Sequence, residues 1–456
     1  MDEYQLLNLT ITDSVRLIKG REITPLELME ATLARIERLN GKLNAYLHVM
    51  RDESIKQARY ASEAIRRGED WGALHGIPIA IKDLIDVEGE PTTAGSEFLR
   101  HNIAKEDAAV VTQLRAAGAI IVGKTNLHEY AVGATNANPH YGPARNPWNE
   151  ALSPGGSSGG SGAAVAALMA SGALGTDTGG SVRIPSALCG LTGLRPAKGR
   201  VSAQGVIPMS WTLDAVGPMA RSAEDVALLL DVLDAGVDRP ALASQGLATP
   251  VKGMRLGVVI DPYFWNETDV EIVGAVRAAI DKLSDIGLEV VEVRLEMLEA
   301  ALKASQVISI SEALAYHQER LAAEPEKFGA DVRGRLESAA GRTAVEYALA
   351  RQTGREWRRL LRDLFRGKAD LLIMPTTQTQ APRLEGIESV QAGRPLLRFN
   401  YPYSLSYLPA LSAPCGFSED GLPVGMQLVA PRESTVLAVA HAYQQSTDWH
   451  TRRPVL

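Results

Sequence analysis

Cysteine is scarce in this chain of 456 residues, which contains Cys189 and Cys415 and no third cysteine. Two cysteines exclude a disulfide framework and a cysteine-rich metal site, and we expect both thiols to be buried. Histidine pairs at the spacing of a metal site are missing as well, since the eight histidines are scattered along the chain. The sequence therefore predicts no metal centre, and nothing in it implies a cofactor.

Long apolar runs are also missing, because none approaches the ~18–20 residues that a membrane span requires. The first ten residues, MDEYQLLNLT, are acidic and lack the apolar core of a signal peptide. A net charge of −7 lacks the basic excess of a nucleic-acid binder. These absences predict a cytoplasmic protein that acts on small molecules, with neither nucleic acid nor membrane as a partner. They leave its oligomeric state open.

Strand and helix patterns alternate along the chain, which predicts the α/β class. The segment ITPLELMEATLARIERLNG predicts a helix that begins after Thr24, with Glu27 completing a capping box, and that ends at Asn40-Gly41. No linker divides the sequence, so we expect one domain over residues 1–456. Residues 295–367 are helical in pattern and are expected to form a subdomain or cap. Buried strands are expected in IPIAIKD, AIIVGKTN, RLGVVID and ADLLIMPTT, and a hairpin in ALSAPCGFSEDGLPVGMQLVA.

Residues 155–190 contain two Gly-Gly-Ser clusters, GGSSGG and TGGSV, around a small-residue stretch that is expected to be helical. A phosphate-binding loop fits poorly, because no lysine follows the glycines and no strand precedes them. A Ser-His-Asp site fits poorly too, because no histidine lies in a nucleophile elbow. A serine nucleophile here would need another base, and a purely structural turn and helix is the alternative.

A lysine is the remaining candidate for that base. Lys82 ends the apolar segment GIPIAIKD, so its amine starts in the protein interior, where burial favours the neutral form. The alternative for Lys82 is a salt bridge, since Asp83 and Asp86 are close in sequence.

Four segments together resemble the amidase signature family: GIPIAIKDLIDVEGEPTTAGS, GGSSGGSGAAVAA, GTDTGGSVRIPSALCGLTGLRP and GLPVGMQL. The resemblance runs from about residue 10 to the end and is weakest over 295–367. It implies the fold of that family, a central mixed twisted sheet covered on both faces by helices. It also implies hydrolysis of the C–N bond of linear amides through a seryl acyl-enzyme.

The resemblance assigns a Ser–cis-Ser–Lys triad to this chain. Ser181 would be the nucleophile, Ser157 the bridging serine after a cis peptide bond, and Lys82 the base. Asp177 and Arg183, which flank the nucleophile, are expected to form a structural ion pair. The oxyanion hole would be formed by the backbone N–H groups of Thr178, Gly179, Gly180 and Ser181.

Two departures bear on the branch of the family. The tRNA-dependent amidotransferase branch usually carries MDEFxMG and SSLDQIGP, where this chain has LHEYAVG and WTLDAVGPM. These differences favour a free-standing amidase. The alternatives are a subunit of a tRNA-dependent glutamine amidotransferase and a non-catalytic scaffold subunit.

The segment YSLSYLPA departs from the family's FNLTGLPA, and the variable segments expected to line the pocket are apolar and aromatic. They predict a neutral substrate, such as an aryl or alkyl amide, an ester or a carbamate, and disfavour a dicarboxylate or a malonamate-type anion. Free glutamine is expected to be a poor substrate, because these segments offer no basic residue to hold its carboxylate. The pocket residues expected are Tyr130, Met209, Trp211, Tyr403 and Tyr407.

Overall fold

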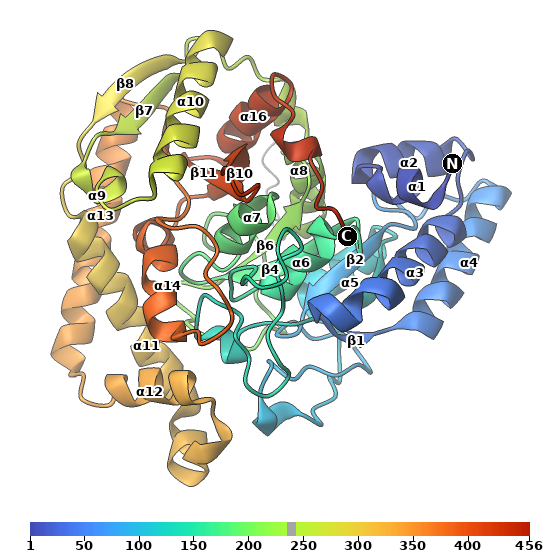
Figure 1. The fold of residues 1–456 in the computed structure, drawn as a ribbon, viewed down its shortest axis with the longest axis horizontal. Coiled ribbons are helices and arrows are strands. Elements are labelled where there is room, and N and C mark those ends of the chain that lie inside the picture. The colour runs from blue at the N-terminus through green and yellow to red at the C-terminus, as the bar shows by residue number, and fades with distance from the viewer. Residues whose placement is uncertain (235–242) are drawn as a thin grey trace.

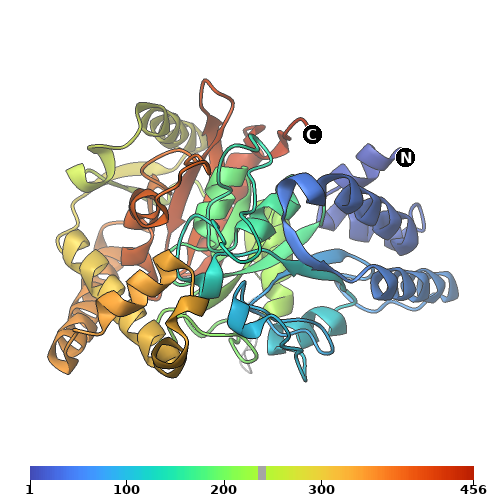
Figure 2. The ribbon, with the colours of Figure 1, turned by 60° about the horizontal axis from the view of Figure 1, so that its bottom comes forward.

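A computed structural model describes residues 1–234 and 243–456. Within these residues, eleven strands form one sheet in the order β1-β3-β2-β4-β6-β5-β10-β11-β9-β7-β8, flanked by helices (Figures 1 and 2). Strand β2 pairs in parallel with β3 and β4, and β7 with β8 and β9, whereas the other neighbours are antiparallel. The predicted α/β class with a mixed central sheet is confirmed.

The strands are short and mostly buried. They are β1 (Tyr46–Val49), β2 (Pro78–Lys82), β3 (Ile120–Thr125), β4 (Gly172–Asp177), β5 (Thr192–Arg195), β6 (Ala215–Ala220), β7 (Arg255–Val259), β8 (Glu289–Val293), β9 (Leu371–Pro375), β10 (Ala410–Phe417) and β11 (Pro423–Val429).

The helices precede, separate and follow these strands in the chain. They are α1 (Glu3–Asn8), α2 (Ile11–Lys19), α3 (Pro25–Leu43), α4 (Arg51–Arg67), α5 (Ala109–Ala116), α6 (Gly159–Ala166), α7 (Arg183–Cys189), α8 (Ala223–Leu233), α9 (Pro262–Trp265), α10 (Val270–Ile286), α11 (Leu298–Ala323), α12 (Ala330–Ala339), α13 (Ala344–Gly367), α14 (Ser389–Arg398), α15 (Tyr401–Ser406) and α16 (Glu433–Gln444).

Helix α3 begins as its sequence predicts and ends later. Thr24 and Glu27 form the expected capping box. The predicted end at Asn40-Gly41 is wrong, because the helix continues to Leu43, whose side chain is fully buried. Asn44 then takes the left-handed conformation that commonly ends a helix.

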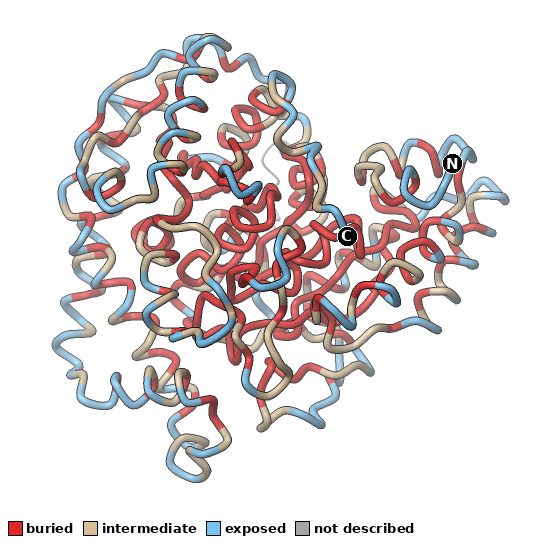
Figure 3. The backbone as a smooth tube through the Cα atoms, in the orientation of Figure 1, coloured by how far each residue is buried: buried red, intermediate tan, exposed pale blue. Residues whose placement is uncertain are grey.

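Two fully buried helices, α6 and α7, pack against each other at the centre of the molecule (Figures 1 and 3). The stretch between the Gly-Gly-Ser clusters is helical only over α6, and its second half is the unpredicted strand β4. Strands β2 and β4 are neighbours, with Ile81 opposite Leu174. This pairing brings the ends of both strands together near the first serine cluster.

Helices α11, α12 and α13 occupy the region predicted to be helical and lie together at one side of the molecule (Figure 1). Helix α11 packs against α12, α13 and α15. Both cysteines are buried free thiols, as predicted. None of the helices in the described residues combines the length and apolar character that a membrane crossing requires.

Candidate active site

Lys82 is fully buried at the end of β2. Its Nζ lies 2.6 Å from Ser157 Oγ and 2.7 Å from Thr176 Oγ1, which belongs to the neighbouring strand β4. Burial lowers the pKa of Lys82 to about 7, against the opposing influence of the Asp214 and Asp177 carboxylates. An appreciable fraction of this amine is therefore neutral near neutral pH.

Lys82 does not form the salt bridge that the nearby aspartates suggested as its alternative role. The Asp83 carboxylate instead lies 3.0 Å from the Nζ of Lys124, another buried lysine. Within the described residues, no carboxylate forms an ion pair with Lys82. Its contacts are with hydroxyl groups, which can exchange protons with a neutral amine.

Ser157 belongs to the first serine cluster and contacts the lysine. The peptide bond from Gly156 to Ser157 is cis, as the family resemblance implies. The neighbouring Ser158 holds the first serine cluster against β4, since its Oγ accepts a hydrogen bond from the N–H of Thr176 at 3.2 Å. Its backbone N–H donates to the carbonyl of Ser181 at 3.3 Å, which joins the two serine clusters directly.

Ser181 lies in the loop between β4 and α7, where it lines a cavity together with Thr178 and Gly179. The loop is fixed by the carboxylate of Asp177, which accepts the N–H of Gly180 at 2.9 Å and pairs with the guanidinium of Arg183 at 2.8 Å. Burial alone would favour the neutral acid, but the Arg183 guanidinium and then that of Arg195 hold the pKa of Asp177 well below its usual value. The predicted structural ion pair is present.

The four N–H groups expected to form an oxyanion hole are not equally available. The N–H of Gly180 donates to the Asp177 carboxylate at 2.9 Å, so it is not free for the hole. Within the described residues, the N–H groups of Thr178, Gly179 and Ser181 have no hydrogen-bond acceptor. Three donors beside the Ser181 hydroxyl thus remain free for an oxygen of a ligand.

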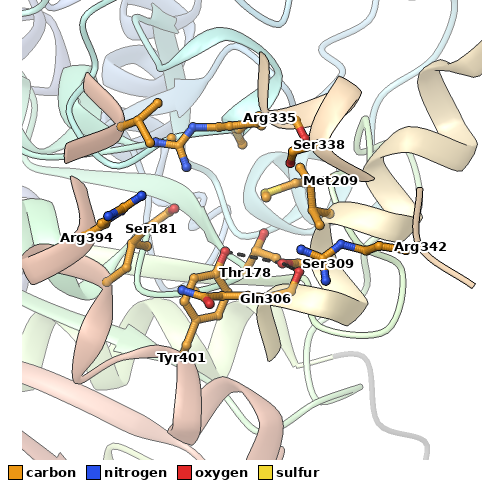
Figure 4. Close-up of a pocket in the computed structure, with 17 residues that line it drawn as sticks. Thr178, Ser181, Met209, Gln306, Ser309, Arg335, Ser338, Arg342, Arg394 and Tyr401 are labelled. Atoms are coloured by element: carbon orange, nitrogen blue, oxygen red, sulfur yellow. Dashed lines mark hydrogen bonds between the residues drawn. The ribbon is translucent and has the colours of Figure 1, made fainter. Parts of the chain in front are cut away.

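The cavity beside Ser181 has a volume of about 260 Å³ (Figure 4). Its walls come from the segment Ala131–Gly133, the nucleophile loop, and helices α11, α12, α14 and α15. The lining residues are Ala131, Val132, Gly133, Thr178, Gly179, Ser181, Met209, Gln306, Ser309, Ile310, Arg335, Ser338, Arg342, Val390, Arg394, Leu397 and Tyr401.

Of the five pocket residues expected from the sequence, Met209 lines this cavity and the other four do not. Tyr130 is fully buried, with its ring centroid 4.2 Å from that of His317. Trp211 is on the surface and 52% exposed. These residues belong to segments that approach the cavity, but their side chains point elsewhere.

The aromatic residues of the C-terminal segment need the same correction. Tyr403 is fully buried in the apolar core, where it packs near Trp357. Tyr407 ends α15 in a left-handed conformation, and the guanidinium of Arg358 lies 4.3 Å from its ring centroid. The tyrosine that faces the cavity is Tyr401, two residues before Tyr403 and on another side of α15.

Tyr401 also explains why the nucleophile loop needs glycine. A Cβ on Gly179 would lie 2.5 Å from the ring of Tyr401. The Tyr401 hydroxyl lies 3.3 Å from Ser309 Oγ, and this contact connects α15 to α11 (Figure 4). The sequence does not reveal which of these tyrosines faces the cavity, because the direction of each ring depends on where α15 begins.

The segments expected to line the pocket contain no basic residue, but the expectation that the pocket therefore lacks them is wrong, because other segments supply arginines. Arg335, Arg342 and Arg394 line the cavity with Ser181. Arg335 and Ser338 lie three residues apart on α12, and Arg342 follows that helix. That polar stripe was visible in the sequence, but such a stripe usually faces solvent. Among the described residues, no cluster of three or more possible metal ligands occurs.

Comparison with known proteins gives consistent matches over nearly the whole chain. A sequence model of the family Amidase matches residues 27–437. One subunit of the glutamyl-tRNA(Gln) amidotransferase of Azotobacter vinelandii is 41% identical over 98% of this chain and 99% of its own length. An amidase of Pseudomonas putida is 39% identical over 99% of this chain and 98% of its own.

A solved structure from work on the evolutionary origins of an s-triazine catabolic enzyme, described as a vestigial protein complex, has a similar fold. It superimposes with a TM-score of 0.91 at 32% identity and covers 98% of this chain and 100% of its own.

Proposed function

The chain belongs to the amidase family and is an amide hydrolase, and we propose that it acts as a free-standing enzyme through an acyl-enzyme on Ser181. The observation that carries this proposal is the contact of a buried amine with a buried hydroxyl, Lys82 Nζ to Ser157 Oγ at 2.6 Å. The backbone N–H of Ser158, which follows Ser157, donates a hydrogen bond to the backbone carbonyl of Ser181. A buried base and a chain of hydroxyls beside a cavity are what a serine nucleophile without histidine requires.

The proposed reaction begins with neutral Lys82. It accepts the proton of Ser157, which accepts the proton of Ser181 as the Ser181 oxygen attacks the amide carbonyl. The oxyanion that forms is stabilised by the free N–H groups of Thr178, Gly179 and Ser181. The proton returns through Ser157 to the leaving nitrogen, and the C–N bond breaks.

Water then attacks the acyl-enzyme by the same proton route and releases the acid. Esters and carbamates contain the same carbonyl next to a leaving group, so the same steps serve them as well. We therefore propose activity on linear amides, with hydrolysis of activated esters and carbamates by the same Ser181.

The alternative is a role within a tRNA-dependent amidotransferase, and the relative from Azotobacter vinelandii favours it. An enzyme of that kind takes its ammonia from glutamine, a zwitterion. Among the described residues that line the cavity there is no aspartate or glutamate to receive an ammonium group. This observation, with the LHEYAVG and WTLDAVGPM segments, supports the free-standing enzyme.

The test is hydrolysis by the purified chain alone. A panel of linear amides, a p-nitrophenyl ester and an aryl carbamate should be cleaved without tRNA, ATP or another protein. Ser181→Ala should lose this activity, whereas Ser446→Ala, which changes an exposed serine near the C-terminus, should keep it. Cleavage that needs tRNA and a partner would support the alternative, and equal activity in Ser181→Ala would refute the nucleophile.

A further inference from the structure

Three guanidinium groups surround the cavity that contains Ser181. Arg335 comes from α12, Arg342 follows that helix, and Arg394 comes from α14 (Figure 4). Arg335 and Arg394 are close enough for the charge of one to disfavour the charge of the other. The lining residues in the described part of the chain include no carboxylate that would offset these charges.

Of the three arginines, Arg335 has the most buried nitrogens without a hydrogen-bond partner among the described residues. Its Nε and Nη2 nitrogens are buried and have no hydrogen-bond partner among the described residues. Burial lowers the pKa of Arg335, but a guanidinium remains charged in proteins. The Nε of Arg342 is likewise buried and unpartnered in the described part of the chain.

The acidic residue near Arg335 is already paired with another side chain. Asp331, one turn before Arg335 on α12, has its carboxylate 2.9 Å from the Nε2 of His128. Its negative charge raises the pKa of Arg335, but within the described residues it forms no ion pair with Arg335. A buried cationic group without a paired anion is costly, so a site of this kind is suited to an anionic ligand.

We infer that the substrate is a small amide bearing a carboxylate, which Arg335 binds with help from Arg342 or Arg394. This inference rests on the proposed function of the same site and specifies its substrate class. Guanidinium and carboxylate groups match in a two-pronged geometry, which fixes the position of the bound acid as well as its affinity. A volume of about 260 Å³ is suited to a short chain between the carboxylate and the amide.

The three arginines also favour amides that carry a carboxylate over free glutamine. A dicarboxylic acid monoamide presents only an anion to the arginines. Glutamine adds an ammonium group, which the three guanidinium groups repel and which no lining carboxylate of the described residues receives. We therefore expect glutaramate, which is glutamine without its amino group, to be a much better substrate than glutamine.

The experiment compares malonamate, succinamate and glutaramate with propanamide, butanamide and pentanamide, the neutral amides of the same chain lengths. The best anionic substrate should have a kcat/KM about 10- to 100-fold above its neutral partner, the range expected for charge-assisted hydrogen bonds. Arg335→Met should abolish this ratio, and Arg335→Lys should restore part of it. Arg333→Met is the matched control, because Arg333 lies on α12 and pairs with Glu337 at the surface.

Equal rates for neutral and anionic amides, or an equal loss on both in Arg335→Met, would overturn the inference while leaving the amide hydrolase intact. Binding of glutarate and succinate to Ser181→Ala, measured by calorimetry, does not depend on turnover. Saturable binding that Arg335→Met removes supports the anion site even where the Ser181 mechanism fails. Failure of both acids to bind, together with no preference for the anionic amides, contradicts it.

Discussion

At the scale of single residues, the protonation state of Lys82 decides whether the proposed reaction can start. Its amine is surrounded by the hydroxyls of Ser157 and Thr176 and is fully buried. Loss of solvation disfavours the ammonium form and lowers the pKa to about 7. At higher pH the amine is neutral and can accept a proton, whereas at lower pH it is charged and cannot.

This gives the first expected outcome, a pH dependence. The kcat/KM for an amide should rise with pH through about 7 and reach a plateau on the alkaline side, because the free enzyme needs neutral Lys82. The profile should be measured with a slow amide, so that chemistry limits the rate. A flat profile from about pH 6 to about pH 9 would contradict Lys82 as the base.

The second expected outcome concerns Lys82 and Ser157 together. Lys82→Ala and Ser157→Ala should each lose most of the amidase activity, and the double variant should be hardly worse than either. Residues that act as one proton-transfer unit are strongly non-additive. The measurement is kcat/KM of the two single variants and the double variant, with circular dichroism to confirm folding. Losses that multiply would mean that the two residues act independently.

How far the site could be predicted differs from residue to residue. The roles of Lys82, Ser157 and Ser181 are implied by the family resemblance, and the structure brings the first two within hydrogen-bonding distance. Tyr401 and Arg335 do not follow from the sequence. The direction of a side chain on a short helix, or of a polar stripe on a helix far along the chain, depends on packing that the sequence does not reveal.

At the scale of elements, the loop between β4 and α7 is held by a buried network of charges. Arg183 donates to both oxygens of Asp177, at 2.8 and 2.9 Å, and to Ser404 Oγ at 2.9 Å. The Arg195 guanidinium reaches Asp177 as well. These groups line no part of the cavity, and they position the backbone that presents Ser181.

The third expected outcome follows from this network. Arg183→Met should lower the free energy of unfolding by about 3–5 kcal/mol, because it removes the guanidinium that bonds both oxygens of the buried Asp177 carboxylate and leaves the carboxylate with the longer contact to Arg195. Urea unfolding measures this loss. Arg333→Met, which breaks an exposed pair on α12, should change the stability by no more than about 0.5 kcal/mol. Similar values for both variants would contradict the anchoring role of Arg183.

Elements themselves were predictable where periodicity or capping is strong. Helix α3 has its capping box, and β2, β3, β7 and β9 appear as buried apolar runs. Strand β4 was missed because GALGTD has no β-branched residue before its threonine and merges with the small residues of α6. Pairing with β2 and β6, not local preference, makes this segment a strand.

At the scale of the whole molecule, the sheet assembles the site from distant parts of the chain. Strands β2 and β4 are far apart in sequence but adjacent in the sheet, and this adjacency brings Lys82 to Thr176. The sequence predicted an α/β protein, and the order of its eleven strands could not be deduced from local patterns. The order depends on contacts between segments that are remote in the chain.

The helices α11 and α12 add the opposite wall of the cavity. They lie in the segment where the family resemblance is weakest, and they contribute Gln306, Ser309, Arg335 and Ser338. We propose that residues 295–367 act as the subdomain that selects the substrate, while the sheet and its loops supply the chemistry. Specificity and reactivity would then come from separate regions of one chain.

The fourth expected outcome concerns the enzyme as a complete unit. The purified chain should hydrolyse amides at a rate that tRNA, ATP and added partner proteins leave unchanged, because both the proposed triad and the three arginines come from this chain. Rates with and without each addition measure this directly. Stimulation by tRNA together with a partner protein would point to an amidotransferase.

The central claim is that Ser181 carries the acyl group, and intact-mass spectrometry tests it most directly. The chain should be mixed rapidly with a p-nitrophenyl ester and quenched in acid, with Ser181→Ala treated in parallel. We expect a mass increase of one acyl group, located by peptide mapping on Ser181 and absent from the variant. An adduct on another residue, or unchanged hydrolysis in Ser181→Ala, would contradict the account.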